Sequence, residues 1–225
     1  MTTGFVHVIE SPSAQDLLDG RTEGRSLCEA MSLASIPHCY SLATTLDSFR
    51  AALGARLTDA AAQHNAPPIL HLSMHGNDEG VALTDGTFLT WSELRSELTD
   101  LKNAMLGGLL ICMSSCFGGA GCRMAMHDDS DHPFWALVGN TGEALWADAA
   151  VGYIAFYHQF FKGKSVQGCV EVMRIASGDM RFLSLSGHEV QASWRAHIAG
   201  QRRSQVAPSA SGGLLSIFAN EPPAE

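Results

Sequence analysis

Two mainly apolar runs dominate the hydrophobic pattern of the chain, at residues 69–74 and 109–113. Each has the length of a strand, and continuous apolar runs are typical of parallel strands buried on both faces. Shorter apolar segments predict further strands at residues 5–10, 36–42 and 135–139, and an edge strand at 181–185. The pattern therefore predicts a sheet whose central strands are covered on both sides.

Segments with apolar residues at helical spacing lie between most of these strands. One apolar stripe follows residues 46–57, and Thr90 with Glu93 has the spacing of a capping box at the start of another helix. Helical spacing is also found at residues 17–33, with an interruption at 20–24, and further helices are predicted at 147–161, 165–177 and 190–198, with a small hairpin at 81–89. Because strands alternate with helices, we expect an α/β protein with a mostly parallel central sheet and helices on both faces.

Two stretches interrupt this alternation. Residues 118–133 are rich in glycine, aspartate and histidine and offer few core-forming side chains, so we expect a mobile loop with at most one helical turn. Residues 208–213 have the composition of a flexible connector. The predicted organisation is one domain over residues 1–206, followed by a flexible tail at 207–225.

The composition mainly excludes classes of partner. Hydrophobic residues make up 46% of the chain and charged residues 16%, which is enough for a substantial core. The net charge is −9 without a basic stripe, which argues against nucleic-acid binding. No apolar stretch reaches the roughly 18 residues that cross a bilayer, and the N-terminus does not resemble a signal peptide. We therefore expect no membrane span and a cytoplasmic location.

The cysteines and histidines do not have the spacing of a metal site. The chain has six cysteines, which we expect to be free thiols, since a chain of this length does not need disulfides. Cys112, Cys116, Cys122 and His127 lack the short paired spacing of zinc ligands. The acidic segment at 127–132 lacks the ligand alternation of a calcium loop. Neither a metal nor another cofactor is expected.

Candidate chemistry follows the two central apolar runs. His75 ends the first and is followed by Gly76, whereas Cys116 ends the second and is followed by Phe117 and two glycines. If the two strands are neighbours, both side chains emerge at the same edge of the sheet. A cysteine attacks as its thiolate, and a nearby imidazole commonly activates it. The N–H groups of Gly76 and Cys116 would then converge on a developing oxyanion. The alternative is a structural histidine in a turn and a buried thiol.

These blocks resemble the caspase-like (clan CD) cysteine peptidases, within which the chain is most similar to the CHAT branch of bacterial caspase-like domains. The resemblance spans residues 6–173 and rests on four segments. They are residues 72–76 (LSMHG), 89–94 (LTWSEL), 113–119 (MSSCFGG) and 156–166 (FYHQFFKGKSV). The resemblance implies a caspase-like three-layer α/β/α sandwich with a mostly parallel central sheet.

The resemblance also implies roles for individual residues. His75 becomes the general base and acid, Cys116 the nucleophile, and Gly76 and Cys116 the oxyanion donors. The position two residues before the nucleophile helps to select the substrate in this group; it is Gln in caspases and Asp in metacaspases, but Ser114 here. Ser114 alone therefore indicates neither an Asp-specific nor an Arg-specific pocket. Arg21 or Arg25 is a candidate to meet an acidic substrate side chain, and Asp148 a basic one. The alternatives are solvated loop arginines and an acid that stabilises a helix start.

The expected function is that of a cysteine endopeptidase that uses a His-Cys dyad to cleave a protein partner. The resemblance implies a bacterial defence or cell-death module that is regulated by an activating protein partner, with residues 118–133 gating the site. A catalytically silent caspase-like scaffold or binding subunit is the alternative. A flavodoxin-like ligand-binding domain fits less well, because no glycine-rich phosphate loop follows the first strand.

Overall fold

The structure is a computed structural model, and it describes residues 4–104, 108–127 and 132–206. Its strands are β1 (Phe5–Ser11), β2 (His38–Leu42), β3 (Pro68–Gly76), β4 (Gly80–Ala82), β5 (Phe88–Thr90), β6 (Leu110–Ser114), β7 (Ala136–Asn140) and β8 (Phe182–Ser186). Its helices are α1 (Ala14–Leu18), α2 (Glu23–Leu33), α3 (Leu46–Ala51), α4 (Leu57–His64), α5 (Trp91–Ala104), α6 (Trp146–Phe160), α7 (Val166–Ser177) and α8 (Gly187–Val206). A π-helical segment, η1 (Ala52–Arg56), joins α3 to α4, and η2 (Gly118–Ala125) is a 3₁₀ helix.

The main sheet has the strand order β2-β1-β3-β6-β7-β8. All neighbours along this path are parallel except β7 and β8, which run antiparallel at one edge. The short strands β4 and β5 form a hairpin that pairs with the end of β3. The predicted architecture, with a mostly parallel sheet between helices, is confirmed, and so are the two central apolar strands.

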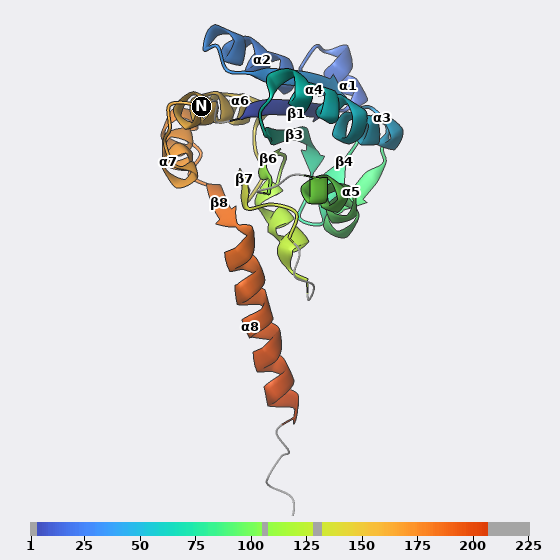
Figure 1. Cartoon of the computed structure of the whole chain (residues 1–225), viewed down its shortest axis with the longest axis vertical. Coiled ribbons are helices and arrows are strands. Elements are labelled where there is room, and N and C mark those ends of the chain that lie inside the picture. The colour runs from blue at the N-terminus through green and yellow to red at the C-terminus, as the bar shows by residue number, and fades with distance from the viewer. Residues whose placement is uncertain (1–3, 105–107, 128–131, 207–225) are drawn as a thin grey trace, which may run out of the picture.

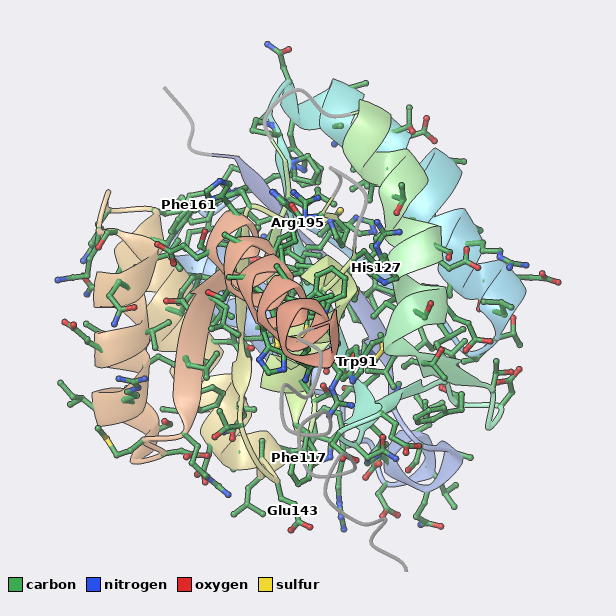
Figure 2. The ribbon with its side chains drawn as sticks, turned by 90° about the horizontal axis from the view of Figure 1, so that it is seen from below. Trp91, Phe117, His127, Glu143, Phe161 and Arg195 are labelled. Carbon is green, nitrogen blue, oxygen red and sulfur yellow. The ribbon has the colours of Figure 1, made fainter. Side chains whose placement is uncertain are left out.

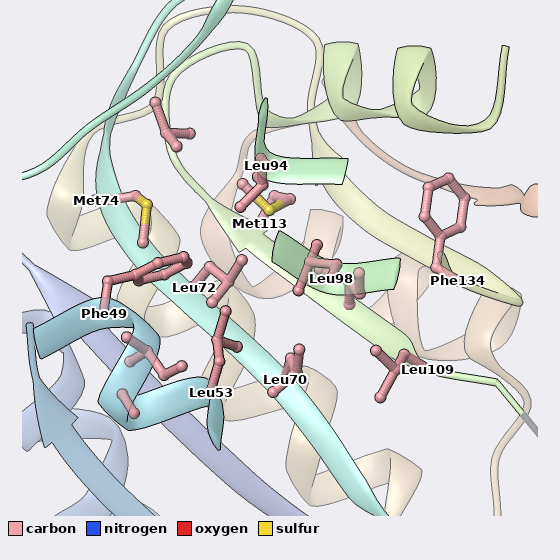
Figure 3. Packing of buried hydrophobic residues seen from close by; sticks show 14 of the residues in the cluster. Phe49, Leu53, Leu70, Leu72, Met74, Leu94, Leu98, Leu109, Met113 and Phe134 are labelled. Carbon is pink, nitrogen blue, oxygen red and sulfur yellow. The ribbon is translucent and has the colours of Figure 1, made fainter. Parts of the chain in front are cut away.

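Strand alternation divides the core into two clusters, one on each face of the sheet. On one face, Leu70 and Leu72 of β3 pack with residues of α3, α4 and α5 (Figure 3). On the other face, Ile69 packs with residues of α2, α6 and α7. Figure 1 shows α6 and α7 on one side of the molecule and α5 on the other. The two helical layers fix the ends of β3 and β6, where the candidate residues lie.

The segment after β6 differs from the prediction. Its first half is the 3₁₀ helix η2, in which Met124 and Ala125 are completely buried, so the expectation of a loop with few core-forming residues is wrong there. The glycines explain the difference, because a Cβ on Gly118 would lie 2.6 Å from the carbonyl oxygen of Met113. Glycine therefore lets this helix lie directly against β6 and β7. Residues 128–131 of the expected loop lie outside the described residues.

The C-terminal helix α8 is longer than the predicted helix at 190–198 and extends away from the sheet (Figure 1). The predicted tail at 207–225 lies outside the described residues, so the proposed domain boundary stays a prediction. Within the described residues, no helix is both long and apolar enough to cross a membrane.

Candidate active site

The two candidate residues lie at the ends of adjacent parallel strands. β3 and β6 are paired in a register that places Ser73 opposite Ser114. His75 lies two residues after Ser73, and Cys116 lies two residues after Ser114. Because side chains two residues apart point to the same face of a strand, His75 and Cys116 lie on the same face of the sheet as the two serines. The expectation that these strands are neighbours is confirmed.

His75 and Cys116 line the same cleft, which is open to solvent. The floor and one side come from the ends of β3 and β6, and the opposite wall comes from Ala144, Trp146 and Ala149 at the start of α6. Both reactive side chains therefore border one space that solvent can enter.

The imidazole of His75 is held from two sides. Its Nε2 atom is 2.9 Å from Oδ2 of Asp16, and its ring makes an edge contact with Trp146 at a centroid distance of 5.4 Å. The His75 side chain is 44% exposed, whereas that of Asp16 is only 12% exposed. Because the carboxylate accepts a hydrogen bond from Nε2–H, the neutral ring carries its lone pair on Nδ1. His75 is therefore in the tautomer that lets Nδ1 act as a base.

Asp16 is itself fixed by the start of α1. The hydroxyl of Ser13 caps this helix by accepting from the Asp16 N–H, and it also donates to the Asp16 carboxylate. The hydrogen bond from Ser13, followed by that from His75, lowers the pKa of Asp16 below its usual value. Asp16 thus stays ionised and oriented toward His75 near neutral pH.

Cys116 lies in a sharp turn between β6 and η2. Phe117 directly after it has a left-handed backbone with φ of +55°, and its N–H donates to the carbonyl of Gly142 at 2.8 Å. Phe117 and Glu143 accordingly lie near each other, at the lower edge of the view in Figure 2. The Cys116 thiol is half-buried, with Sγ 3.8 Å from the carbonyl oxygen of Ala144. A left-handed non-glycine residue is uncommon, and here it turns the chain so that the thiol faces the cleft.

The strand register also determines where the Gly76 N–H points. The Asn77 N–H donates to Gly80 of β4, so Asn77 belongs to a hydrogen-bonded pair and Gly76, opposite Val81, does not. In an antiparallel ladder, the N–H of a residue in a non-hydrogen-bonded pair points away from the partner strand. The Gly76 N–H therefore points away from β4, toward the β6 side of the strand. In the described part of the chain the Cys116 N–H makes no hydrogen bond, so two donors are available beside the cleft.

A buried carboxylate lies under the floor of the cleft. Glu23, in the first turn of α2, accepts hydrogen bonds from Ser73 at 2.6 Å and from Ser114 at 2.8 Å. His71, one step deeper in the same column, has Nε2 at 3.9 Å from Glu23 and Nδ1 at 2.8 Å from the hydroxyl of Tyr157. All of these side chains are buried. The negative charge of Glu23 is thus held beneath Ser114 by two serine hydroxyls.

The loop that forms the far wall is held by a second polar cluster. Asn140, at the end of β7, donates to Asp179 at 2.7 Å and accepts from the Gly142 N–H at 2.9 Å. The guanidinium of Arg181 makes two hydrogen bonds to Asp179, each 2.9 Å long, which is the main reason that the pKa of Asp179 falls to about 2. This cluster fixes Gly142, whose carbonyl receives the Phe117 N–H.

The structure brings together some of the predicted site residues and not others. His75, Ser114 and Cys116 line the cleft. Arg21 is paired with Asp19 at 3.4 Å, Arg25 is exposed on α2, and Asp148 is half-buried in the first turn of α6. None of these three lines the cleft, so a contact between them and a substrate side chain finds no support in the geometry.

Three important side chains of the site were missed by the sequence analysis: Asp16, Glu23 and Trp146. Asp16 is 59 residues from His75, and Glu23 is 91 residues from Ser114. The only local signal is the capping pair Ser13 and Asp16, which predicts a helix start and not a catalytic role. These residues reach the site through the folding of α1, α2 and α6 onto the sheet.

The other cysteines are poor candidates for a nucleophile. Burial raises the pKa of Cys112 to about 12 and that of Cys28, Cys39 and Cys169 to about 11, and it also raises the pKa of Cys122. The thiolate is the reactive form, so these thiols react slowly near neutral pH. No group of three or more metal-binding side chains is found among the described residues.

Comparisons with known proteins give similarity at the level of solved structures only. No family model and no curated protein matches the chain. Thirty-four solved chains match, among them the Arg-specific cysteine proteinase gingipain R (RGPB), with a TM-score of 0.48 and 10% identity over 78% of this chain and 42% of that chain. A complex of Porphyromonas gingivalis RgpB pro- and mature domains matches with a TM-score of 0.46 and 13% identity over 79% of this chain and 43% of that chain. The chain spans less than half the length of these two solved chains.

Proposed function

We propose that this chain is a cysteine endopeptidase in which Cys116 is the nucleophile and His75 the general base and acid. The observation that supports this most strongly is the position of the two side chains at the ends of adjacent strands, lining one cleft. The hydrogen bond from His75 to Asp16 adds an orienting acid to the pair. A nucleophile, a base and a group that orients the base are the general pattern of covalent peptidase catalysis.

The reaction begins with transfer of the Cys116 proton to Nδ1 of His75. The thiolate then attacks the carbonyl carbon of the scissile peptide bond, and the carbonyl oxygen becomes an oxyanion. The N–H groups of Gly76 and Cys116 stabilise this charge, with about 3 kcal/mol for each well-placed donor.

Protonated His75 next gives its proton to the leaving amine, so that the C–N bond breaks and a thioester remains on Cys116. A water molecule, deprotonated by His75, hydrolyses the thioester, which releases the acid and restores the thiol. Asp16 stabilises the imidazolium ion that forms in both half-reactions, because its ionised carboxylate stays hydrogen-bonded to Nε2.

The alternative of a silent scaffold accounts less well for these features. A scaffold needs neither the exposed edge of His75, nor its pairing with an ionised Asp16, nor a half-buried thiol facing the same cleft. Most of the finer parts of the proposal are supported by the resemblance in sequence. They are membership of the CHAT branch, a protein substrate in a bacterial defence or cell-death module, and control by an activating partner. The proposed cytoplasmic location is supported instead by the lack of an apolar stretch long enough to cross a bilayer.

The proposed function is tested by incubating the purified chain with a mixture of protein-derived peptides and identifying the cleaved bonds by mass spectrometry. Cys116→Ala should abolish every cut, because no other thiol lines the cleft. Cys122→Ala serves as the matched control and should leave the cuts unchanged. Peptide cleavage that persists in Cys116→Ala would show that the peptidase site lies elsewhere or belongs to a contaminant.

A further inference from the structure

Ser114 lies on the floor of the cleft beside the candidate catalytic pair, and Ser73 is its neighbour on the adjacent strand. They face one another across β3 and β6, one step before His75 and Cys116 on the same face of the sheet. Ser114 lines the cleft, whereas Ser73 is completely buried next to it. A substrate side chain that enters the cleft next to Cys116 therefore lies close to Ser114.

The hydrogen bonds of these serines determine which ligands the floor can accept. A serine hydroxyl has one O–H donor and two acceptor lone pairs. Both serines use their only donor on Glu23, at 2.6 Å from Ser73 and 2.8 Å from Ser114. The Ser114 oxygen then has only acceptor capacity left for the cleft. A ligand group must donate hydrogen bonds to it, and a carboxylate, which only accepts, is repelled.

The negative charge of Glu23 beneath the floor also favours a ligand group that donates hydrogen bonds. The Glu23 side chain is 1% exposed, so its field is weakly screened by solvent. Two other ionisable groups near it are His71, whose Nε2 is 3.9 Å away and lacks a hydrogen-bond partner within the described residues, and the buried acid Glu10, which interacts with Glu23 electrostatically. Asp16 adds a second negative charge at the rim, through its contact with His75. A cationic side chain is attracted to such a cleft, and more so because the net charge of the chain is −9.

The cation nearest to the wall loop does not cancel this preference. Arg181 is bound by Asp179, and Glu143 and Asp148 also act on it electrostatically. Its charge is therefore compensated by three acids. Arg181 does not line the cleft, so it does not offer a site for an acidic substrate there.

We propose that Glu23, acting through Ser114, makes the cleft selective for a basic side chain on the N-terminal side of the cut bond. This inference rests on the proposed peptidase function and names its substrate class. Guanidinium and ammonium groups carry only donors and a positive charge, which matches an acceptor floor above a carboxylate. Glu23 is a specificity-determining residue in this proposal and takes no part in the bond-breaking steps.

The test uses peptide acyloxymethyl ketones, in which the thiolate of Cys116 displaces a carboxylate and forms a thioether. Four probes differ only in the residue next to the reactive group: arginine, its neutral isostere citrulline, lysine and aspartate. The rate of Cys116 modification is measured by mass spectrometry. The arginine and lysine probes should react about 100-fold faster than the citrulline and aspartate probes, since hydrogen bonds and contacts to charged groups are strong in a desolvated site.

Glu23→Gln should reduce the preference for arginine over citrulline to less than about 10-fold, because the charge is removed while the shape is kept. Glu10→Gln is the matched control. Glu10 is also a buried acid on this face, but it binds the Gly24 N–H and the Tyr40 hydroxyl rather than the serines. The control should keep the full preference. If Glu23→Gln does not fold, Ser114→Ala replaces it and should also weaken the preference for arginine.

The outcomes separate this inference from the proposed function. Equal rates for arginine and citrulline, a preference for aspartate, or an unchanged preference in Glu23→Gln would overturn the role of Glu23 and leave the peptidase intact. Labelling of Cys116 by none of the four probes would contradict both.

Discussion

Asp16 and His75 are 59 residues apart in the sequence, yet the Asp16 carboxylate and Nε2 of His75 are 2.9 Å apart. This pairing fixes the imidazole so that Nδ1 is the basic nitrogen. It also joins the first helix of the chain to the end of a central strand. The orientation of the candidate base thus depends on a helix that the sequence does not mark as functional.

Asp16→Asn should lower kcat/KM by about 10- to 100-fold while KM changes little. An amide can donate to Nε2 and so favour the wrong tautomer, and it cannot stabilise the imidazolium ion. The effect should be smaller than in a fully buried triad, because His75 is 44% exposed. Steady-state kinetics on a cleaved peptide measures it, with Asp19→Asn at the opposite end of the same helix as the control. Equal activity of Asp16→Asn and the unmodified protein would remove Asp16 from the mechanism.

Ionised Asp179 should stabilise the fold, so its contribution to the free energy of unfolding should depend on pH. Its pKa is lowered from 3.8 to about 2, mainly by Arg181. The stabilisation is therefore present above pH 3.8 and is lost as the pH falls from 3.8 through about 2. Asp179→Asn should lower the free energy of unfolding by about 1–2 kcal/mol at pH 7. This value is smaller than the full pKa shift implies, because Arg181 is half exposed and solvent screens its charge.

Urea unfolding of Asp179→Asn and the unmodified protein at several pH values measures this effect. The difference between the two should shrink as the pH falls toward 2. Glu171→Gln, an exposed acid on α7, is the control and should show no such change. A constant difference from pH 7 to pH 3 would mean that the Arg181 contact contributes little.

Gly139→Ala should destabilise the fold by about 1–3 kcal/mol and also lower activity. A Cβ on Gly139 would lie 2.6 Å from the carbonyl carbon of Gly118 and 2.7 Å from the nitrogen of Gly119. Relief of these clashes must move η2 and with it the turn that holds Cys116. Gly54→Ala is the control, since its added Cβ meets nothing within 4 Å. The midpoint temperature of thermal unfolding should fall for Gly139→Ala and stay unchanged for Gly54→Ala.

Much of the fold follows from the sequence because local patterns determine it. The apolar runs that become β3 and β6 predict buried strands, and Thr90 with Glu93 predicts the start of α5, where Glu93 accepts from Thr90. The positions of His75 and Cys116 at the ends of neighbouring strands follow from the same patterns and from the order of parallel strands.

The rest of the site depends on contacts between distant segments. Asp16 and Glu23 lie on short or amphipathic helices whose packing brings them to the strand ends, and no local pattern encodes that packing. Ser114 taken alone gave no indication of substrate preference, because its meaning depends on the carboxylate beneath it. The segment after Cys116 is predicted to be a loop because it is rich in glycine, aspartate and histidine and has few core-forming side chains. In the structure, the small size of glycine allows η2 to pack against the sheet.

The central claim is that Cys116 is a nucleophile activated by His75. The most direct test is the rate at which a peptide acyloxymethyl ketone modifies each cysteine of the intact chain, read out by mass spectrometry in the unmodified protein and in His75→Ala. The account predicts rapid modification at Cys116, a loss of at least about 100-fold in His75→Ala, and little reaction at buried Cys112. Preferential modification of Cys112 or Cys122, or an unchanged rate at Cys116 in His75→Ala, would contradict it.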